Sequence, residues 1–316
     1  EGFRTDVTVM NLSLLNTGRY IYYAAKLLPE AKRIQLSIPM EEWKSSKNNF
    51  RRYNGEVVVF PKNDVTFEPL PNEVRMDQIE IKGRGIQYDY QYLLKQDLAV
   101  IDILKTNAWK RPIYFTNTIA QSDYIGLEVG FRVEGMAYRV TPFRSEASSE
   151  DPYKVGHMDA NRTYDLMLNE FSYDGIIGAY DKITRMYEMA GSLSAIYNRL
   201  AIGLMESGDT AKVPAVLRKY LEIFPPGKIK PGFMDGQLCL YAHLAGEPEL
   251  GARFSESVMQ FLKTELPTYY EKTKRDRLLL DLHLQTLRNV FDVIDAPDKK
   301  AELEEIVNPP GTILRR

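Results

Sequence analysis

Residues 197–226 read YNRLAIGLMESGDTAKVPAVLRKYLEIFPP, and this stretch decides the fold of the C-terminal half of the chain. Apolar residues recur at helical spacing on both sides of the turn signal at Gly208, and two prolines stop the second run. Two amphipathic runs joined by a short turn that contains glycine predict a pair of packed helices. We expect the core of this pair to include Leu200, Leu204 and Leu217.

This helix pair resembles a tetratricopeptide (TPR) unit, with bulky, small, turn and stop residues where the 34-residue pattern has them. A second, degenerate copy turns at Gly246 and places Leu238 in the core, and Pro267 opens a further long helix that would cap the array. We therefore predict an all-α TPR-like domain over residues 151–316, with antiparallel helices around the turns at Gly208 and Gly246.

The first half of the chain alternates strand and helix signals. A long amphipathic run predicts a helix over residues 90–107, and short apolar or β-branched runs predict strands. Strands separated by such helices suggest crossover connections, which favour a mostly parallel sheet. We predict an α/β domain over residues 1–150, followed by a polar linker over residues 144–161. The predicted strands are 7–12, 56–60, 74–81, 112–116 and 138–143.

Composition and charge exclude several classes of function. The formal net charge of −2 gives no overall attraction to nucleic acid or to an anionic membrane, so we expect no nucleic-acid partner. No apolar run approaches the ~20 residues that span a bilayer. The single cysteine, Cys239, excludes an internal disulfide. Because residue 1 is Glu, we expect the chain to be a processed or excised piece of a longer protein.

The motifs of common catalytic chemistries are absent from the sequence. His157, His243 and His283 form no short metal-binding pair, and packing or surface roles suit them better than ligation. There is no nucleophile elbow, P-loop or paired-cysteine motif. We therefore expect no catalytic residue, no metal and no cofactor. Residues 82–85 (KGRG) contain two glycines and two cations that could cradle a phosphate at a helix N-terminus, but a plain flexible loop is the simpler interpretation.

Polar residues follow several of the predicted strands and form a candidate ligand site. In an open parallel sheet the carboxyl ends of the strands lie at one edge, where ligands bind. Hydroxyl and amide groups there would suit hydrogen bonding to a sugar or a phosphate better than proton transfer. Helix N-caps and turns explain several of these residues equally well. The candidate residues are Asn11, Ser13, Asn16, Arg84, Thr116 and Asn117.

Four stretches carry a resemblance to a known family: residues 6–15 (DVTVMNLSLL), 107–115 (NAWKRPIYF), 134–139 (EGMAYR) and 164–175 (YDLMLNEFSYDG). Together they resemble the C-terminal soluble region of a bacterial family of multi-spanning membrane proteins, long known as a domain of unknown function. That family is similar to the eukaryotic transmembrane protein O-mannosyltransferase with lumenal TPR repeats. The resemblance implies a preceding membrane domain of the glycosyltransferase C type, and that the first βα unit of the α/β domain lies upstream.

The resemblance implies a function for the parent protein rather than for the chain alone. We expect a non-catalytic accessory domain of a membrane-embedded glycosyltransferase, on the periplasmic side of the bacterial inner membrane. Its expected partners are its own membrane domain and either the acceptor protein or the lipid-linked sugar donor. The family's presumed catalytic carboxylates lie in the membrane half, so none is assigned to this chain. The alternative is a protein-interaction scaffold of an envelope membrane protein that transfers no sugar.

Overall fold

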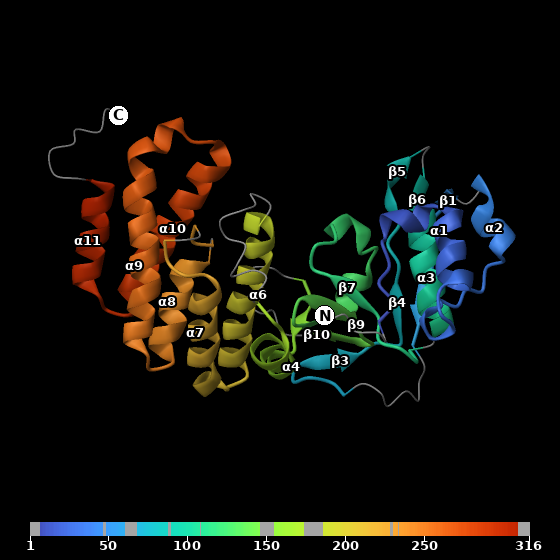
Figure 1. Ribbon diagram of the computed structural model, residues 1–316, viewed down its shortest axis with the longest axis horizontal. Coiled ribbons are helices and arrows are strands. Elements are labelled where there is room, and N and C mark those ends of the chain that lie inside the picture. Colours follow the sequence, from blue (N-terminus) through green and yellow to red (C-terminus); the bar gives the residue numbers. More distant parts are fainter. Residues whose placement is uncertain are drawn as a thin grey trace. The chain divides into compact units, whose positions relative to one another are not determined.

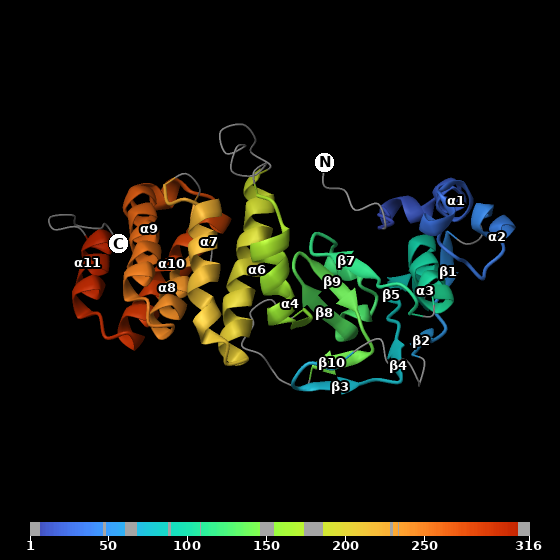
Figure 2. The ribbon, with the colours of Figure 1, turned by 60° about the horizontal axis from the view of Figure 1, so that its bottom comes forward.

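A computed structural model (Figures 1 and 2) describes residues 7–46, 49–60, 68–87, 90–107, 109–145, 155–173, 186–227, 230–232 and 234–308. The chain divides into two compact units. The first, here called the β-rich unit, comprises residues 1–133 and 137–157, and the second, the helical unit, comprises residues 134–136 and 158–316.

The β-rich unit is built from short strands in several small sheets. The strand orders are β1-β6-β5, β10-β3, β11-β8-β9-β7 and β2-β4. The strands are β1 (Phe50–Arg52), β2 (Val57–Val59), β3 (Glu73–Arg75), β4 (Gln78–Glu80), β5 (Arg84–Gln87), β6 (Tyr90–Leu94), β7 (Tyr114–Thr116), β8 (Phe131–Glu134), β9 (Ala137–Val140), β10 (Phe143–Ser145) and β11 (His157–Met158).

The prediction of a mostly parallel sheet is wrong. Register is defined for five strand pairs among the described residues, and all five are antiparallel. The physical reason is the length of the connections: β5 leads into its partner β6 after two residues, and β8 into β9 through a turn at Gly135, whose φ is 61°. Such connections close hairpins, whereas a parallel pair needs a crossover of a dozen or more residues.

Some of the predicted strands form and others do not. Residues 7–11 form no strand, and the predicted strand 74–81 divides into β3 and β4, which belong to different sheets. The strands predicted over 56–60 and 112–116 appear as β2 and β7, and the last predicted strand as β9 followed by β10. Part of the predicted linker, residues 146–154, lies outside the described residues.

Among the described residues of the β-rich unit, the helices are short except for α3. They are η1 (Ser13–Asn16), α1 (Gly18–Tyr22), the π-helical η2 (Tyr23–Leu27), η3 (Glu30–Lys32), α2 (Met40–Lys44), α3 (Lys95–Asn107), η5 (Gln121–Asp123) and η6 (Leu127–Gly130). The helix predicted from residue 90 begins at Lys95 because residues 90–94 form β6, the middle strand of its sheet. The Asp97 carboxylate accepts a hydrogen bond from the backbone N–H of Leu94 (2.8 Å) and so caps this helix start.

Lys95 and Asp102, two of the three buried charged side chains of α3, tie the segment around α2 to the helix. The Lys95 ammonium donates to the carbonyl oxygens of Trp43 and Ser45, both at 3.0 Å, at the C-terminal end of α2. The negative end of a helix dipole suits such a cation. Asp102 accepts hydrogen bonds from the hydroxyl (2.5 Å) and backbone N–H (2.9 Å) of Ser37 and from the N–H of Ile38 (3.2 Å). These contacts fix the extended segment before α2.

The four-stranded sheet carries an aromatic core. The Phe131 ring stacks on Tyr138 with centroids 5.3 Å apart, and Tyr124 meets it edge-on at 5.0 Å. Phe115, from the NAWKRPIYF block, packs 5.3 Å from Phe131. All four side chains are buried. The sequence block that carried the family resemblance thus contributes to a hydrophobic core.

The helical unit consists, over its described residues, of antiparallel helix pairs joined by tight turns, as predicted. Gly208 and Gly246 adopt the left-handed conformation at φ 81° and 80°, which glycine tolerates best, and each closes one pair. Leu200, Leu204 and Leu217 are fully buried, as is Leu238. The helices are α4 (Ala160–Asp165), η7 (Leu166–Glu170), α6 (Met186–Glu206), η8 (Thr210–Lys212), α7 (Val213–Ile223), α8 (Asp235–Leu244), α9 (Pro248–Glu265), η9 (Leu266–Glu271), α10 (Lys274–Val293) and α11 (Pro297–Val307).

The long helix expected to open at Pro267 begins later. Residues 266–271 form the 3-10 helix η9, and α10 starts at Lys274 with Thr273 as its N-cap. α9, α10 and α11 share one hydrophobic cluster, to which they contribute Val258, Leu287 and Leu303 respectively. This arrangement of helix pairs followed by terminal helices is compatible with a TPR-like array.

Candidate functional site

Arg84 lies at the centre of a polar cluster of the β-rich unit that joins several elements. Its Nε and Nη2 atoms each lie 2.7 Å from a different oxygen of the Asp97 carboxylate, and Nη2 also lies 2.6 Å from Oδ1 of Asp123. The Arg84 and Asp97 side chains are 14% and 2% exposed. The first residue of β5 is therefore joined to the first turn of α3 and to η5.

Asn16 extends this cluster to a fourth element, η1. Its side-chain amide donates to Oε1 of Gln96 (2.6 Å) and accepts from the Gln96 backbone N–H (3.0 Å). The amide of Gln96 in turn donates to Oδ1 of Asp123 (3.2 Å). We call these five side chains, Asn16, Arg84, Gln96, Asp97 and Asp123, the Arg84 network.

The Arg84 network is suited to bracing the fold rather than to chemistry. Hydrogen bonding to Asp97 is the largest cause that raises the pKa of Arg84, so the guanidinium stays charged at any physiological pH. Its charge is opposed by two carboxylates, which gives the cluster a formal charge of −1 and disfavours a phosphate. The network contains no serine, cysteine or histidine, and both of its carboxylates are engaged by the Arg84 guanidinium.

The structure brings together two of the six predicted ligand residues, Asn16 and Arg84, within the Arg84 network. Asn11 accepts a hydrogen bond from the Leu14 N–H (3.1 Å), and Ser13 is exposed on η1. Thr116 ends β7 and shares a hydrogen bond of 2.9 Å with Thr118, and Asn117 lies in the turn between them. Within the described part of the chain, no hydrogen bond joins these four residues to the Arg84 network. The parallel edge on which we based the ligand site does not form, and ligand binding itself stays a prediction.

Residues 82–85, considered as a phosphate cradle but interpreted as a plain flexible loop, do not precede a helix. Arg84 begins the strand β5, so no helix N-terminus is available to hold an anion there. The Lys82 ammonium forms an ion pair with Glu128 at 2.6 Å. Both cations of this loop are therefore engaged with carboxylates.

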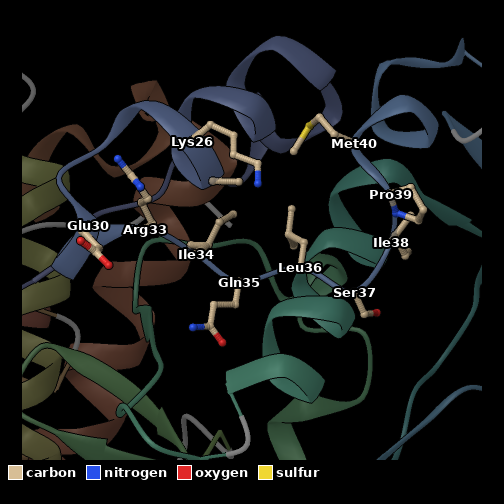
Figure 3. Close-up of a pocket in the computed structure, with 11 residues that line it drawn as sticks. Lys26, Glu30, Arg33, Ile34, Gln35, Leu36, Ser37, Ile38, Pro39 and Met40 are labelled. Atoms are coloured by element: carbon tan, nitrogen blue, oxygen red, sulfur yellow. The ribbon is translucent and has the colours of Figure 1, made fainter.

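A surface groove opens on the side of the β-rich unit that carries η2. It has a volume of about 620 Å³ and lies between η2 and the extended segment that leads to α2. Figure 3 shows Ile34 and Leu36 pointing into it beneath Lys26, while Gln35 points to the opposite side of the segment. We call it the Lys26 groove. Its lining residues are Ala25, Lys26, Glu30, Arg33, Ile34, Gln35, Leu36, Ser37, Ile38, Pro39 and Met40.

The helical unit contains a buried polar cluster of its own. The Tyr220 hydroxyl donates to Oδ1 of Asp235 (2.5 Å) and lies 3.1 Å from the Ser194 hydroxyl. Burial raises the pKa of Asp235 to about 7. Asn198 donates to the carbonyl of Met234 at 3.2 Å, which holds the start of α8 against α6. The cluster lies in the helical core and joins α6, α7 and α8.

The three histidines are dispersed. His157 lies in β11, His243 near the end of α8, and His283 is fully buried in α10. The His283 ring meets Phe261 edge-on at 5.7 Å, and burial lowers its pKa to about 4, so it is neutral and packs like an aromatic side chain. Among the described residues no group of acidic, histidine or cysteine side chains is arranged to hold a metal ion. In the same part of the chain, no helix is long and apolar enough to cross a membrane.

Sequence reasoning missed Gln96, Asp97 and Asp123, the partners that engage Asn16 and Arg84. One signal was available: polar residues interrupt the apolar spacing at the start of α3, where an acidic residue stabilises a helix N-terminus. Asp123 gave no such signal, because η5 packs near β5 only through tertiary contacts. The Lys26 groove was equally hidden, since its apolar residues occupy an irregular segment with no helical or strand period.

Fold and site together define a class: a β-rich unit braced by internal ion pairs, followed by helices compatible with a TPR-like array, with no catalytic constellation among the described residues. Residues 57–162, about a third of the chain, match the family described as TMEM260-associated domain 2. The match runs from β2 into α4 and includes Arg84, Gln96, Asp97 and Asp123. Comparison with curated proteins found no match, and comparison with solved structures found none either.

Proposed function

We propose that the chain is a non-catalytic accessory part of a membrane-embedded, O-mannosyltransferase-like glycosyltransferase, where it positions the acceptor protein or the lipid-linked donor on the periplasmic side. The observation that carries this proposal is the match of residues 57–162 to TMEM260-associated domain 2, because TMEM260 is an O-mannosyltransferase-like membrane protein. The resemblance of the flanking stretches 6–15 and 164–175 extends the same interpretation beyond the matched residues.

The burial and ion pairing of the acidic side chains support the non-catalytic part of the proposal. Sugar transfer needs a base or carboxylate that can reach a substrate. In the Arg84 network the two carboxylates are held by a guanidinium, and Asp235 lies in a closed helical core. These acids stabilise the fold, which supports our proposal that catalysis belongs to the membrane part of the parent protein.

The positioning role is supported by the helical unit. Stacked helix pairs present extended surfaces on which a peptide can lie, and such arrays commonly bind proteins. An acceptor protein in an extended conformation would suit such a surface better than a sugar would. We therefore favour the acceptor over the donor as the ligand of the helical unit.

The test compares sugar transfer by the full-length parent in membranes with transfer by a parent that lacks residues 158–316. We expect the deletion to reduce transfer to a protein acceptor strongly while transfer of the same sugar to water persists. A parent carrying Arg218→Ala serves as the matched control, since the exposed Arg218–Glu247 pair of this unit contributes little to its stability. Size-exclusion chromatography checks that each membrane protein is intact.

Two results would contradict the proposal. Undiminished transfer to protein by the deletion variant would remove the positioning role. Sugar transfer by purified residues 1–316, abolished by a single substitution, would show that the chain is itself an enzyme. If the parent transfers no sugar but the helical unit still captures an envelope protein, the scaffold alternative holds instead.

A further inference from the structure

Exposed apolar side chains gather at the start of the β-rich unit. Leu27 is 62% exposed, and Tyr22 and Tyr23 are 37% and 46% exposed. On the continuous helical stretch of α1 and η2 these three side chains share one face with the exposed Arg19 and Lys26. We call these five residues the α1 face. Single exposed apolar residues are common on proteins, but a contiguous set marks an interaction surface.

Basic side chains flank the aromatic rings of the α1 face. The Lys44 ammonium lies 5.0 Å from the centre of the Tyr22 ring, and residues 18–28 include Arg19 and Lys26 but no acidic residue. No ion pair involves Arg19 or Lys26 within the described residues. The chain as a whole has a net charge of −2, so attraction to an anionic partner must come from this local concentration of cations.

The Lys26 groove continues this surface, because Lys26 belongs to both. Its floor is aliphatic, with Ile34 and Leu36, while Lys26 and Arg33 supply two cations against the single carboxylate of Glu30 (Figure 3). The extended segment that forms the floor is fixed by its hydrogen bonds to Asp102. An amphiphile with an apolar part and an anionic head would find both features already in place.

We propose that the α1 face and the Lys26 groove bind the surface of a lipid bilayer that contains anionic phospholipid. Tyrosine rings suit the boundary between headgroups and acyl chains, and an exposed leucine beside them can enter it. Arg19, Lys26 and Arg33 lie where they meet lipid phosphates, with their aliphatic stems along the apolar surface. The inference deepens the proposed function, since it names the surface through which an accessory part would rest on the membrane.

The experiment measures co-sedimentation of purified residues 1–316 with vesicles of phosphatidylcholine and with vesicles of phosphatidylcholine and phosphatidylglycerol. We expect binding to the mixed vesicles that weakens as salt is added. The double variant Arg19→Gln/Lys26→Gln should lower the partition coefficient about 30-fold, at about 1 kcal/mol for each basic side chain near an anionic surface. Tyr22→Ser/Leu27→Ser should lower it about tenfold or more.

The matched control is Tyr270→Ser/Leu278→Gln in the helical unit, whose side chains are 77% and 68% exposed. This control should bind as the unaltered chain does, and circular dichroism verifies that every variant is folded. Absence of binding to both kinds of vesicle, or equal binding by the α1-face variants, overturns the proposal.

Two further results would replace the proposal with another occupant. Binding of inorganic phosphate without vesicle binding assigns the groove to a small anion. A dimer that the α1-face variants dissociate, without vesicle binding, assigns the face to a second copy of the chain. Because the assay uses the chain without its parent and measures no sugar transfer, its failure is distinct from failure of the proposed function.

Discussion

Replacing Arg84 by methionine should destabilise the β-rich unit by several kilocalories per mole. The substitution removes three hydrogen bonds and leaves the Asp97 carboxylate, whose side chain is 2% exposed, with the Leu94 N–H as its remaining described partner. Removing one member of a buried ion pair costs about 3–5 kcal/mol. Because the Asp123 side chain is 26% exposed and can regain water, we expect the lower end, about 3 kcal/mol.

Lys82→Met is the matched control for Arg84→Met. Lys82 lies two residues away and also forms an ion pair, but its side chain and that of Glu128 are 64% and 29% exposed. Water competes for such a pair, so its loss should cost less than about 1 kcal/mol.

The assay is urea denaturation followed by tryptophan fluorescence. Both tryptophans, Trp43 and Trp109, are buried in the β-rich unit, so the fluorescence reports this unit without contribution from the helical unit. A loss of about 3 kcal/mol shifts the midpoint by roughly 1–3 M urea. The double variant Arg84→Met/Asp97→Asn should recover part of the loss, because the buried charge is removed with its partner. Equal, small shifts for Arg84→Met and Lys82→Met would refute the assignment of the Arg84 network as a structural brace.

Three further predictions concern stability. Leu217→Ala should cost the helical unit about 2–5 kcal/mol in denaturation followed by circular dichroism, and a loss below ~1 kcal/mol would mean that its helical face is assigned wrongly. The pKa of Asp235 is 3.8 in the unfolded chain and about 7 in the folded one, so the folded state holds this proton more tightly. The helical unit should therefore lose stability as pH rises from about 4 to about 7, by at most about 1.4 kcal/mol per pH unit. Asp235→Asn should flatten this slope, and an unchanged slope would assign it to other groups. Gly18→Ala should lower the tryptophan-monitored midpoint because the added methyl overlaps the Trp43 carbonyl oxygen, whereas Gly85→Ala meets nothing within 4 Å and should change it little.

The helical unit could be predicted from sequence because its signals are local. Each helix pair places apolar residues such as Leu200 and Leu217 at a period of 3.6, and the left-handed turn at Gly208 follows from a residue that tolerates it. The two helices of each pair are neighbours in the chain and are joined by one short turn, so their pairing depends on contacts between adjacent segments. A pattern read along the chain therefore contains most of what determines this unit.

The β-rich unit could not be predicted in the same way. Its strands are mostly three to five residues long, and their partners are set by tertiary contacts rather than by periodicity. β3, for example, pairs with β10 from the far end of the unit. The stretch over residues 90–94 fitted the apolar spacing of the helix that follows it, yet it pairs on both sides as β6. A short apolar run cannot distinguish these two states.

Two of the six candidate ligand residues, Asn16 and Arg84, belong to one polar cluster, but not for the reason on which the prediction was based. Asn16 and Arg84 were grouped because parallel strands would end at one edge. The two side chains are linked indirectly: Asn16 bonds to Gln96, and Gln96 and Arg84 both donate to Asp123. These contacts belong to a structural ion-pair network. The polarity of these residues was informative, whereas the geometry that joins them depends on how η1, β5 and η5 pack around α3.

The burial of Lys95 makes it a natural chemical reporter. Its amine is sequestered against the carbonyl oxygens of Trp43 and Ser45, so an acylating reagent can reach it only after α2 separates from α3. Burial lowers the pKa of this amine only while it is packed against α2, because opening returns the amine to water. The opened amine should therefore react as the exposed lysines do. The rate at which reagent modifies this position, read by peptide mass spectrometry beside exposed lysines, would therefore measure the free energy of local opening around Trp43.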